Sequence, residues 1–125
     1  METLSAVKSY QDLAVWKKAL EMAEMVNRVS ARFPASEKFG MKSQVRRTAA
    51  SVASNIAEGA GRRGSKEYLH FLEMASGSLA EMETILILRQ SLGMASRDQR
   101  TPLLAYAAEI GRMLSGLKRS INSRT

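Results

Sequence analysis

Basic side chains flank and follow one nearly uncharged stretch of this sequence. They are Arg46, Arg47, Arg62, Arg63 and Lys66. Guanidinium and ammonium groups bind phosphate through charge-assisted hydrogen bonds. The last three lie where a helix is expected to begin, and free backbone N–H groups at a helix start also attract anions. The pattern therefore predicts phosphate contacts with a nucleic acid, although the same side chains could be solvated or paired with Glu37 and Glu58.

The composition favours anionic partners and excludes several other classes of function. Nineteen lysines and arginines against twelve acidic residues give a net charge of +7, and there is no cysteine to form a disulfide, a catalytic thiol or a Cys-ligated zinc site. Aromatic residues are few, and none interleaves with the basic cluster, so base-specific recognition is not predicted. No apolar run resembles a signal peptide or a membrane span, so a cytoplasmic protein without membrane contact is expected.

Apolar residues recur at heptad spacing along the whole chain and predict four helices. The predicted helices run from about Gln11 to Ala31 after a Ser9 cap, from Ala35 or Ser36 to Glu58 with a stop at Gly59, from a Ser65 cap to Gly93, and from between Ser96 and Thr101 to residue 121. Short connections favour an all-α, antiparallel up-down-up-down four-helix bundle over residues 10–121. Residues 1–9 are expected to form a flexible lead and residues 122–125 a frayed end.

The second predicted helix carries no charge between Thr48 and Ala57, so it is expected to be enclosed on nearly all sides. One of its rows consists of the small residues Ala50, Ala53 and Ala57, which we expect at an interface between copies of the chain. The competing interpretation is that these residues only fill the core of a single chain.

Polar residues form a seam between the second and third predicted helices. Its members Asn55, Glu58, Ser78 and Glu81 are expected to fix the register of the two helices. Glu81 interrupts an apolar face, so it is expected to be buried and to need a partner, which is either Arg47 or the polar residues of the second predicted helix. A functional pocket at this seam is the alternative interpretation.

Two glycine-rich patterns imitate nucleotide-binding motifs. Gly59-x-Gly61-x-x-Gly64 fits the dinucleotide fingerprint by letter, but that fingerprint requires a preceding strand, and here a helix precedes it. The sequence Gly64-Ser65-Lys66 has the lysine and hydroxyl in the wrong order for a P-loop. Turn glycines are therefore the better interpretation of both patterns.

Two further spacings suggest catalysis only weakly. Glu67-x-x-His70 is half of a di-iron motif, but His70 is the single histidine, so a surface histidine is predicted. Ser115-x-x-Lys118 has a serine–lysine spacing near a fraying helix end, where no pocket is expected. The sequence predicts no catalytic residue, metal, cofactor or small-molecule substrate, and a metal enzyme is the least favoured class.

These segments resemble a four-helix-bundle family whose founding members are encoded in intervening sequences of bacterial 23S ribosomal RNA genes. The matching pieces are Tyr10-Gln11-Asp12-Leu13 with Trp16, Phe33-Pro34 with Glu37, Gln44 with Arg47, Ser54-Asn55-Ile56-Ala57-Glu58-Gly59 followed by Gly61-Arg62, and Phe71-Leu72, Ala75 and Gly77-Ser78-Leu79 with Glu81. The resemblance is strong from residue 10 to about residue 93. It implies a cytosolic protein that assembles into a five-fold ring, in a family without an established enzymatic activity.

The chain is also similar, more distantly, to the accessory proteins of diversity-generating retroelements. Those are pentameric bundles that bind nucleic acid and a reverse transcriptase. Residues and resemblance together predict a non-enzymatic homo-oligomer that binds RNA, DNA or a nucleoprotein through its basic turns. The alternative is an oligomeric scaffold, or a reverse-transcriptase accessory protein, that does not itself contact nucleic acid.

Overall fold

The structure is a computed structural model that describes residues 9–34, 40–94 and 97–124, with only the backbone described over 97–101. A short 3-10 helix, η2 (Tyr10–Asp12), precedes four α-helices. They are α1 (Ala14–Ser30), α2 (Met41–Ala60), α3 (Ser65–Ser91) and α4 (Arg97–Asn122). The described ranges contain no strand, so the all-α class is confirmed. No described helix combines the length and the apolar character that a membrane crossing requires.

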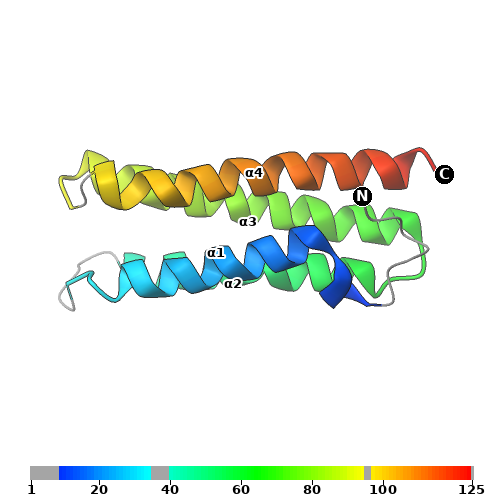
Figure 1. The fold of residues 1–125 in the computed structure, drawn as a ribbon, viewed down its shortest axis with the longest axis horizontal. Helices are drawn as coiled ribbons and strands as arrows, with labels where there is room; N and C mark the ends of the chain where they lie inside the picture. The colour runs from blue at the N-terminus through cyan, green and yellow to red at the C-terminus, as the bar shows by residue number, and fades with distance from the viewer. Residues whose placement is uncertain (1–8, 35–39, 95–96, 125) are drawn as a thin grey trace.

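The four helices lie along the long axis of the molecule, with connections at both of its ends (Figure 1). Each helix packs on its two neighbours, since α2 contacts α1 and α3, and α4 contacts α3 and α1. The core therefore lies on the central axis, and each helix contributes one apolar stripe to it.

The predicted heptad rows supply this core. In α1 the buried row consists of Val15, Ala19, Met22 and Val26, and comparable rows come from the other helices. The buried positions of α2, α3 and α4 include Val45, Val52, Ile56, Leu72, Leu79, Met82, Leu103, Ile110 and Leu114. Burying a side chain of this size contributes about 1.5–3 kcal/mol relative to exposure. The spacing of apolar residues thus determines which face of each helix points inward.

Local sequence fixes most helix ends. Ser9 caps η2 as predicted, because its Oγ accepts a hydrogen bond from the Gln11 N–H at 3.1 Å and its own N–H donates to Asp12 Oδ2 at 3.3 Å. At the end of α3, Gly93 adopts φ +74°, and the N–H groups of Gly93 and Met94 donate to the carbonyls of Gln90 and Arg89. This Schellman arrangement confirms the predicted stop at Gly93.

Several predicted boundaries are wrong by a few residues. α1 begins at Ala14 because Gln11 belongs to the 3-10 turn. α2 begins at Met41 after left-handed Gly40, and the predicted start at Ala35 or Ser36 falls outside the described residues. Ser65 does not cap α3, because Gly64 holds the extended N-cap position and Ser65 is already helical.

The bounds of α4 differ less from the predicted ones. α4 starts inside the predicted window, at Arg97, and places Pro102 beyond its first turn. It continues to Asn122, one residue past the predicted bundle. Most of the predicted N-terminal lead, residues 1–8, falls outside the described ranges.

Gly59 is part of α2 rather than its stop signal, since the helix continues to Ala60. A Cβ atom at this position would lie 3.0 Å from Phe71 Cβ, 3.0 Å from Tyr68 Cδ1 and 3.2 Å from the Tyr68 carbonyl oxygen. Two of these atoms belong to or adjoin the α3 backbone, so they cannot move without moving the helix. The missing side chain of Gly59 therefore allows α2 and α3 to approach closely at this end of the bundle.

We expect Gly59→Ala to lower the free energy of unfolding by about 1–3 kcal/mol, because the added methyl group overpacks the α2–α3 contact. Gly111→Ala is the matched control, because a Cβ there meets only Leu79 Cδ2 at an ordinary 3.8 Å. The free energy of unfolding of this control should rise by roughly 0.5–1 kcal/mol, because alanine has a higher helix propensity than glycine. Urea unfolding followed by circular dichroism measures both, and equal stabilities of the two variants would contradict the close contact at Gly59.

Candidate nucleic-acid interface

Basic residues from two separate parts of the chain meet at one end of the bundle. Figure 1 shows the α2–α3 turn and the C-terminus of α4 at the same end of the molecule. Arg124 lies close enough to Tyr68 of α3 for its charge to act on that phenol. We call this cluster the basic end, defined as Arg62, Arg63, Lys66, Arg119 and Arg124, all of them exposed. The contribution of α4 was not predicted, because nothing in the sequence pairs residue 119 or 124 with the turn.

The start of α3 adds backbone donors to the basic end. Gly64 occupies the N-cap position with φ −95° and ψ 143°, and it has no side chain that could accept from the first turn. The first N–H groups of α3 therefore remain free to bind an anion, and the helix dipole favours negative charge at the same place.

The three basic residues of the turn differ in whether an acidic side chain already pairs with them. Arg62 Nη2 lies 2.9 Å from Glu58 Oε2, one helical turn earlier. This is the ion pair that the sequence offered as the alternative to phosphate binding. Both side chains of this pair are substantially exposed, so the pair stabilises the fold by less than about 1 kcal/mol. Arg63 and Lys66 are exposed and have no ion-pair partner among the described residues. Arg63 and Lys66 are therefore the basic side chains of the turn that are most available to an anion.

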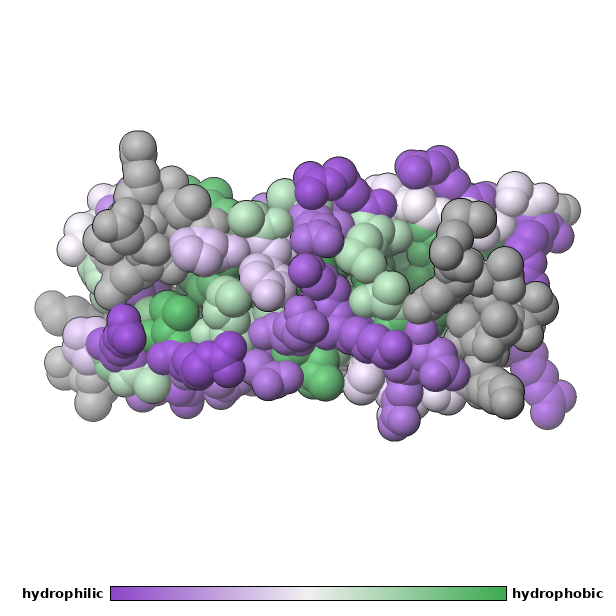
Figure 2. All heavy atoms as spheres, viewed as in Figure 1, coloured by the Kyte–Doolittle hydropathy of each residue, from purple (hydrophilic) through white to green (hydrophobic). Residues whose placement is uncertain are grey.

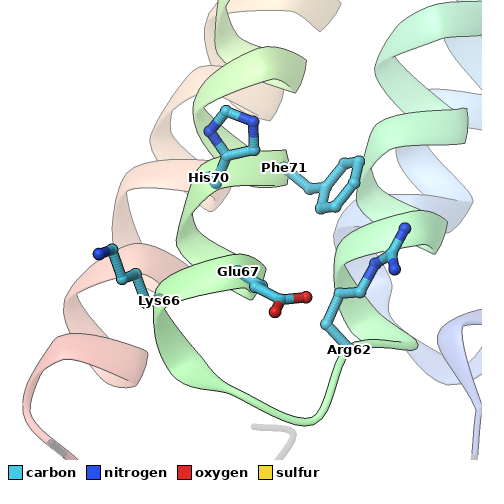
Figure 3. A pocket seen from close by; sticks show the side chains of 5 residues that line it. All are labelled: Arg62, Lys66, Glu67, His70 and Phe71. Atoms are coloured by element: carbon cyan, nitrogen blue, oxygen red, sulfur yellow. The ribbon is translucent and has the colours of Figure 1, made fainter.

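A cleft of about 580 Å³ opens beside the turn. We call it the aromatic cleft, and its lining residues are Arg62, Lys66, Glu67, His70 and Phe71. Figure 3 shows the Phe71 ring reaching from α3 towards α2, with the Arg62 side chain beside it and the Glu67 carboxylate directed towards Arg62. The Arg62 guanidinium carbon lies 4.7 Å from the centroid of the Phe71 ring. An aromatic surface and cations thus share one cleft, although no aromatic residue interleaves with the arginines in sequence.

Tyr68 supports this end of the bundle from the inside. Burial raises the pKa of its phenol, and the nearby positive charge of Arg124 lowers that pKa to a smaller extent. The neutral phenol packs against Gly59 through Cδ1, at the distance where an alanine Cβ would be crowded. Tyr68 therefore acts as a spacer that positions α3, and we assign it no contact with a ligand.

Arg46 has a different role from the one predicted for it. Its Nε donates to Ser30 Oγ at 2.7 Å, and its Nη2 donates to the Asn27 carbonyl oxygen at 3.1 Å. Both partners belong to the last turn of α1, where a cation also complements the helix dipole. Arg46 thus joins α2 to α1 through its Nε and Nη2 groups, which hold its guanidinium against α1. Its neighbour Arg47 is exposed and makes no such contact.

The polar seam forms a second hollow of about 240 Å³, which we call the polar notch. Its lining residues are Gln44, Arg47, Thr48, Ser51, Ser78 and Glu81. At its centre Ser51 Oγ and Ser78 Oγ are 2.8 Å apart, and Asn55 Nδ2 donates to Ser51 Oγ at 3.0 Å. These hydroxyl contacts join α2 to α3, which agrees with the structural role predicted for Asn55 and Ser78.

Two members of the predicted seam do not take part in this network. The prediction of a buried Glu81 is wrong, because this residue is exposed at the rim of the notch, and no ion pair joins it to Arg47 among the described residues. Its outward position removes the need for a buried partner. Glu58 is also exposed, and it pairs with Arg62 outside the hydroxyl network.

The predicted alanine row divides between two environments. Ala53 is only 7% exposed and belongs to the core, because its position on α2 faces inward. Ala50 is exposed and Ala57 is half-buried. Within a single chain α2 therefore has an open face, which includes Ala50, Ser54 and Arg47, so the predicted enclosure of α2 would require other copies of the chain.

The weak catalytic spacings do not assemble a site. His70 is exposed, as predicted, and no group of three potential metal ligands occurs among the described residues. Lys118 Nζ donates to Ser76 Oγ at 2.7 Å and lies 2.9 Å from Glu73 Oε1, whereas Ser115 is exposed. The lysine of that spacing thus pairs with α3 and has no contact with the serine.

Comparisons with known proteins agree with this fold. The sequence pattern of the 23S rRNA-intervening sequence protein family matches residues 11–116. The chain belongs to this family. A crystal structure of a Bacteroides thetaiotaomicron protein of unknown function, from the S23 ribosomal protein family, superposes with a TM-score of 0.75 at 24% identity, covering 84% of this chain and 98% of that one. A search of curated proteins finds no match.

The region of this family member that matches the family pattern extends from η2 into α4. It includes the whole α2–α3 turn and the aromatic cleft, but it ends before Arg119 and Arg124. The family assignment therefore covers the three basic residues of the turn and leaves the C-terminal arginines of the basic end to this chain's own structure.

A buried arginine in this family member was missed by sequence reasoning. Arg89 is 2% exposed, its guanidinium carbon lies 3.3 Å from the Phe33 ring centroid, and Nη2 donates to the Met94 carbonyl oxygen at 3.3 Å. The only sequence signal was its place in the α3 heptad, three residues after the buried Leu86. Arg89 joins the end of α3 to the segment after α1, so it stabilises the fold at the opposite end from the basic cluster.

Arg46 and Arg47 provide a matched test of these assignments. We expect Arg46→Ala to lower the free energy of unfolding by about 1–3 kcal/mol, because it leaves the last turn of α1 without its charged hydrogen-bond donor. Arg47→Ala removes the same charge from an exposed position and should change stability by less than about 0.5 kcal/mol. Urea unfolding measures both variants, and a cost at Arg47 equal to that at Arg46 would contradict the structural role of Arg46.

Proposed function

We propose that this protein is a non-enzymatic, homo-oligomeric helical bundle that binds RNA or DNA through phosphate contacts at its basic end. The observation that carries the proposal is the meeting of the α2–α3 turn with the C-terminus of α4. Together they place exposed cations around the uncapped start of α3. Two carboxylates lie near these cations: Glu58, which is already paired with Arg62, and Glu67 in the first turn of α3.

The free side chains set the expected character of binding. Arg63 and Lys66 have no ion-pair partners among the described residues, so phosphate binding does not require an existing pair to break. Each phosphate contact releases condensed counterions, so affinity should fall steeply with salt. Arg47 is exposed in the polar notch on the α2–α3 face and would add a phosphate contact for a longer ligand that crosses this face.

Self-association is the second part of the proposal, and exposed apolar residues on α3 support it. Met74, Ile87, Leu88 and Leu92 are between 44% and 49% exposed. Ile87, Leu88 and Leu92 lie close together in sequence at the end of α3, and an exposed apolar patch commonly marks an interface. The open face of α2, with Ala50 and Ala57, adjoins α3 and would join the same interface. Within each chain we propose the antiparallel up-down-up-down order, which agrees with the packing of each helix against two others. Five-fold closure of the oligomer is what the family resemblance implies.

A ring would repeat the basic end once per subunit. Several weak phosphate contacts would then act together on one nucleic acid, and the effective affinity would exceed that of a single subunit. Oligomerisation and nucleic-acid binding are thus linked in this proposal.

The alternative is an oligomeric scaffold, or an accessory protein of a reverse transcriptase, without direct contact to nucleic acid. The apolar face of α3 favours this second candidate, since it serves assembly whether or not phosphate binds. The face shown in Figure 2 carries hydrophilic side chains along much of its length, with hydrophobic areas between them. In this alternative the net charge of +7 would serve solubility alone.

We expect a fluorescently labelled RNA or DNA to bind with an affinity that falls as salt rises, with a slope of about 0.9 per phosphate contact on duplex. The double variant Arg63→Ala/Lys66→Ala should weaken binding at low salt and reduce this slope by roughly 2, since two contacts are lost. Fluorescence anisotropy between low and moderate salt measures the slope, and light scattering in the same buffers measures the mass of the assembly.

Arg28→Ala/Arg32→Ala is the charge-matched control. Both residues are exposed at or just beyond the last turn of α1, at the end of the bundle away from the α2–α3 turn (Figure 1). This control should keep the wild-type slope. If the chain binds no nucleic acid even at low salt, the scaffold is the correct function, and if both double variants lose binding equally, the basic end is not the site.

A further inference from the structure

We propose that the aromatic cleft holds one unpaired base of a single-stranded nucleic acid, stacked on Phe71, while the adjoining phosphates bind Lys66 and Arg63. The inference rests on the proposed function and deepens it, because it names a single strand as the ligand and a base as the group that enters the cleft. It also differs from the sequence-based expectation, which contained no aromatic contact.

Phe71 is held in place as a stacking surface. Its Cβ lies 3.0 Å from the position that a Cβ of residue 59 would occupy, so the close approach of α2 fixes the start of the side chain. Arg62 covers part of the ring at 4.7 Å from the centroid, and His70 contacts it edge-on with 5.6 Å between ring centroids. The ring remains only half-buried and lines the open cleft. A ring fixed in this way loses little conformational entropy when a base stacks on it.

The size and chemistry of the cleft fit a planar group that carries an adjoining negative charge. Its volume of about 580 Å³ lies within the range of roughly 300–1,000 Å³ that is typical of small-molecule sites. The ring provides an apolar wall, and the cations of Arg62 and Lys66 line the same space. Proteins that bind single strands combine these two elements, with aromatic side chains for bases and basic side chains for the backbone.

Glu67 determines which part of a nucleotide enters. Its carboxylate is directed towards Arg62 within the cleft (Figure 3), so a phosphate placed beside it would meet a like charge. A base has no such conflict, and its amino groups can donate to the carboxylate. The phosphates are therefore expected outside, at Lys66 and Arg63, with the base inside.

A duplex cannot present a base in this way. Its bases are stacked and paired, and extracting one costs a few kcal/mol, whereas an unpaired base already has free faces. The cleft therefore favours a single strand over a duplex of the same sequence, although phosphate contacts alone would favour the higher charge density of the duplex.

The test compares one labelled ten-nucleotide RNA, single-stranded or annealed to its complement, in anisotropy titrations at several salt concentrations. We expect the wild-type protein to bind the single strand more tightly. Phe71→Leu should weaken single-strand binding on the order of 10-fold to 100-fold with an unchanged salt slope, because only stacking is lost. Phe71→Tyr retains an aromatic face and should bind as the wild type does, which also controls for folding at this position.

Tyr106→Leu is the control for aromatic loss elsewhere. Lys18 Nζ lies 4.6 Å from the centroid of the Tyr106 ring, so this variant also removes an aromatic ring that faces a cation. Binding should not change. If Phe71→Leu binds like the wild type, or if the duplex binds as tightly as the single strand, stacking in the cleft is overturned. Adenosine monophosphate distinguishes a free nucleotide from a single strand as the source of the base. If adenosine monophosphate saturates the site and the oligonucleotide binds no more tightly than it does, a single strand is not the ligand of the cleft.

Failure of this inference is distinguishable from failure of the proposed function. A protein that loses binding through Arg63→Ala/Lys66→Ala but not through Phe71→Leu binds phosphate without a base in the cleft. A protein that binds neither RNA form at low salt overturns both.

Discussion

The close approach of α2 and α3 at Gly59 is the constraint on which the basic end of this bundle depends. Because position 59 has no side chain, the α3 backbone at Tyr68 and Phe71 lies against α2. The same contact brings the turn that carries Arg62 beside the Phe71 ring. A packing requirement thus places an aromatic surface and cations together, and the electrostatics of the site follow from the geometry of two helices.

The basic residues divide into those that hold the fold and those that face outward. Arg46 and Arg89 direct their guanidinium groups to carbonyl oxygens or a ring near the ends of α1 and α3, away from the α2–α3 turn. Arg63 and Lys66 are exposed beside the uncapped start of α3. Net charge alone does not separate these groups. The hydrogen-bond partners of each side chain separate them, because a guanidinium that already donates to helix carbonyls has less capacity to bind phosphate.

Heptad spacing was sufficient to predict the four helices and their buried faces, since burial of apolar side chains dominates helix packing. The burial of residues near the boundary of each buried face was harder to predict. Glu81 was expected inside and lies outside, and Ala53 was expected at an interface and lies in the core. A rotation of a few tens of degrees decides such positions, and it depends on the neighbouring helices. Contacts across the bundle, such as that between Arg124 and Tyr68, have no local sequence signal at all.

The central claim is that nucleic acid binds where the Gly59 contact places Phe71 among the cations. Zero-length photo-crosslinking of a single-stranded RNA to the intact protein, followed by trypsin digestion and mass spectrometry, tests it most directly. We expect a crosslinked base on the peptide from Glu67 to Arg89, with fragmentation placing it at His70 or Phe71. Crosslinks confined to other aromatic positions, such as Trp16 or Tyr106, would contradict it.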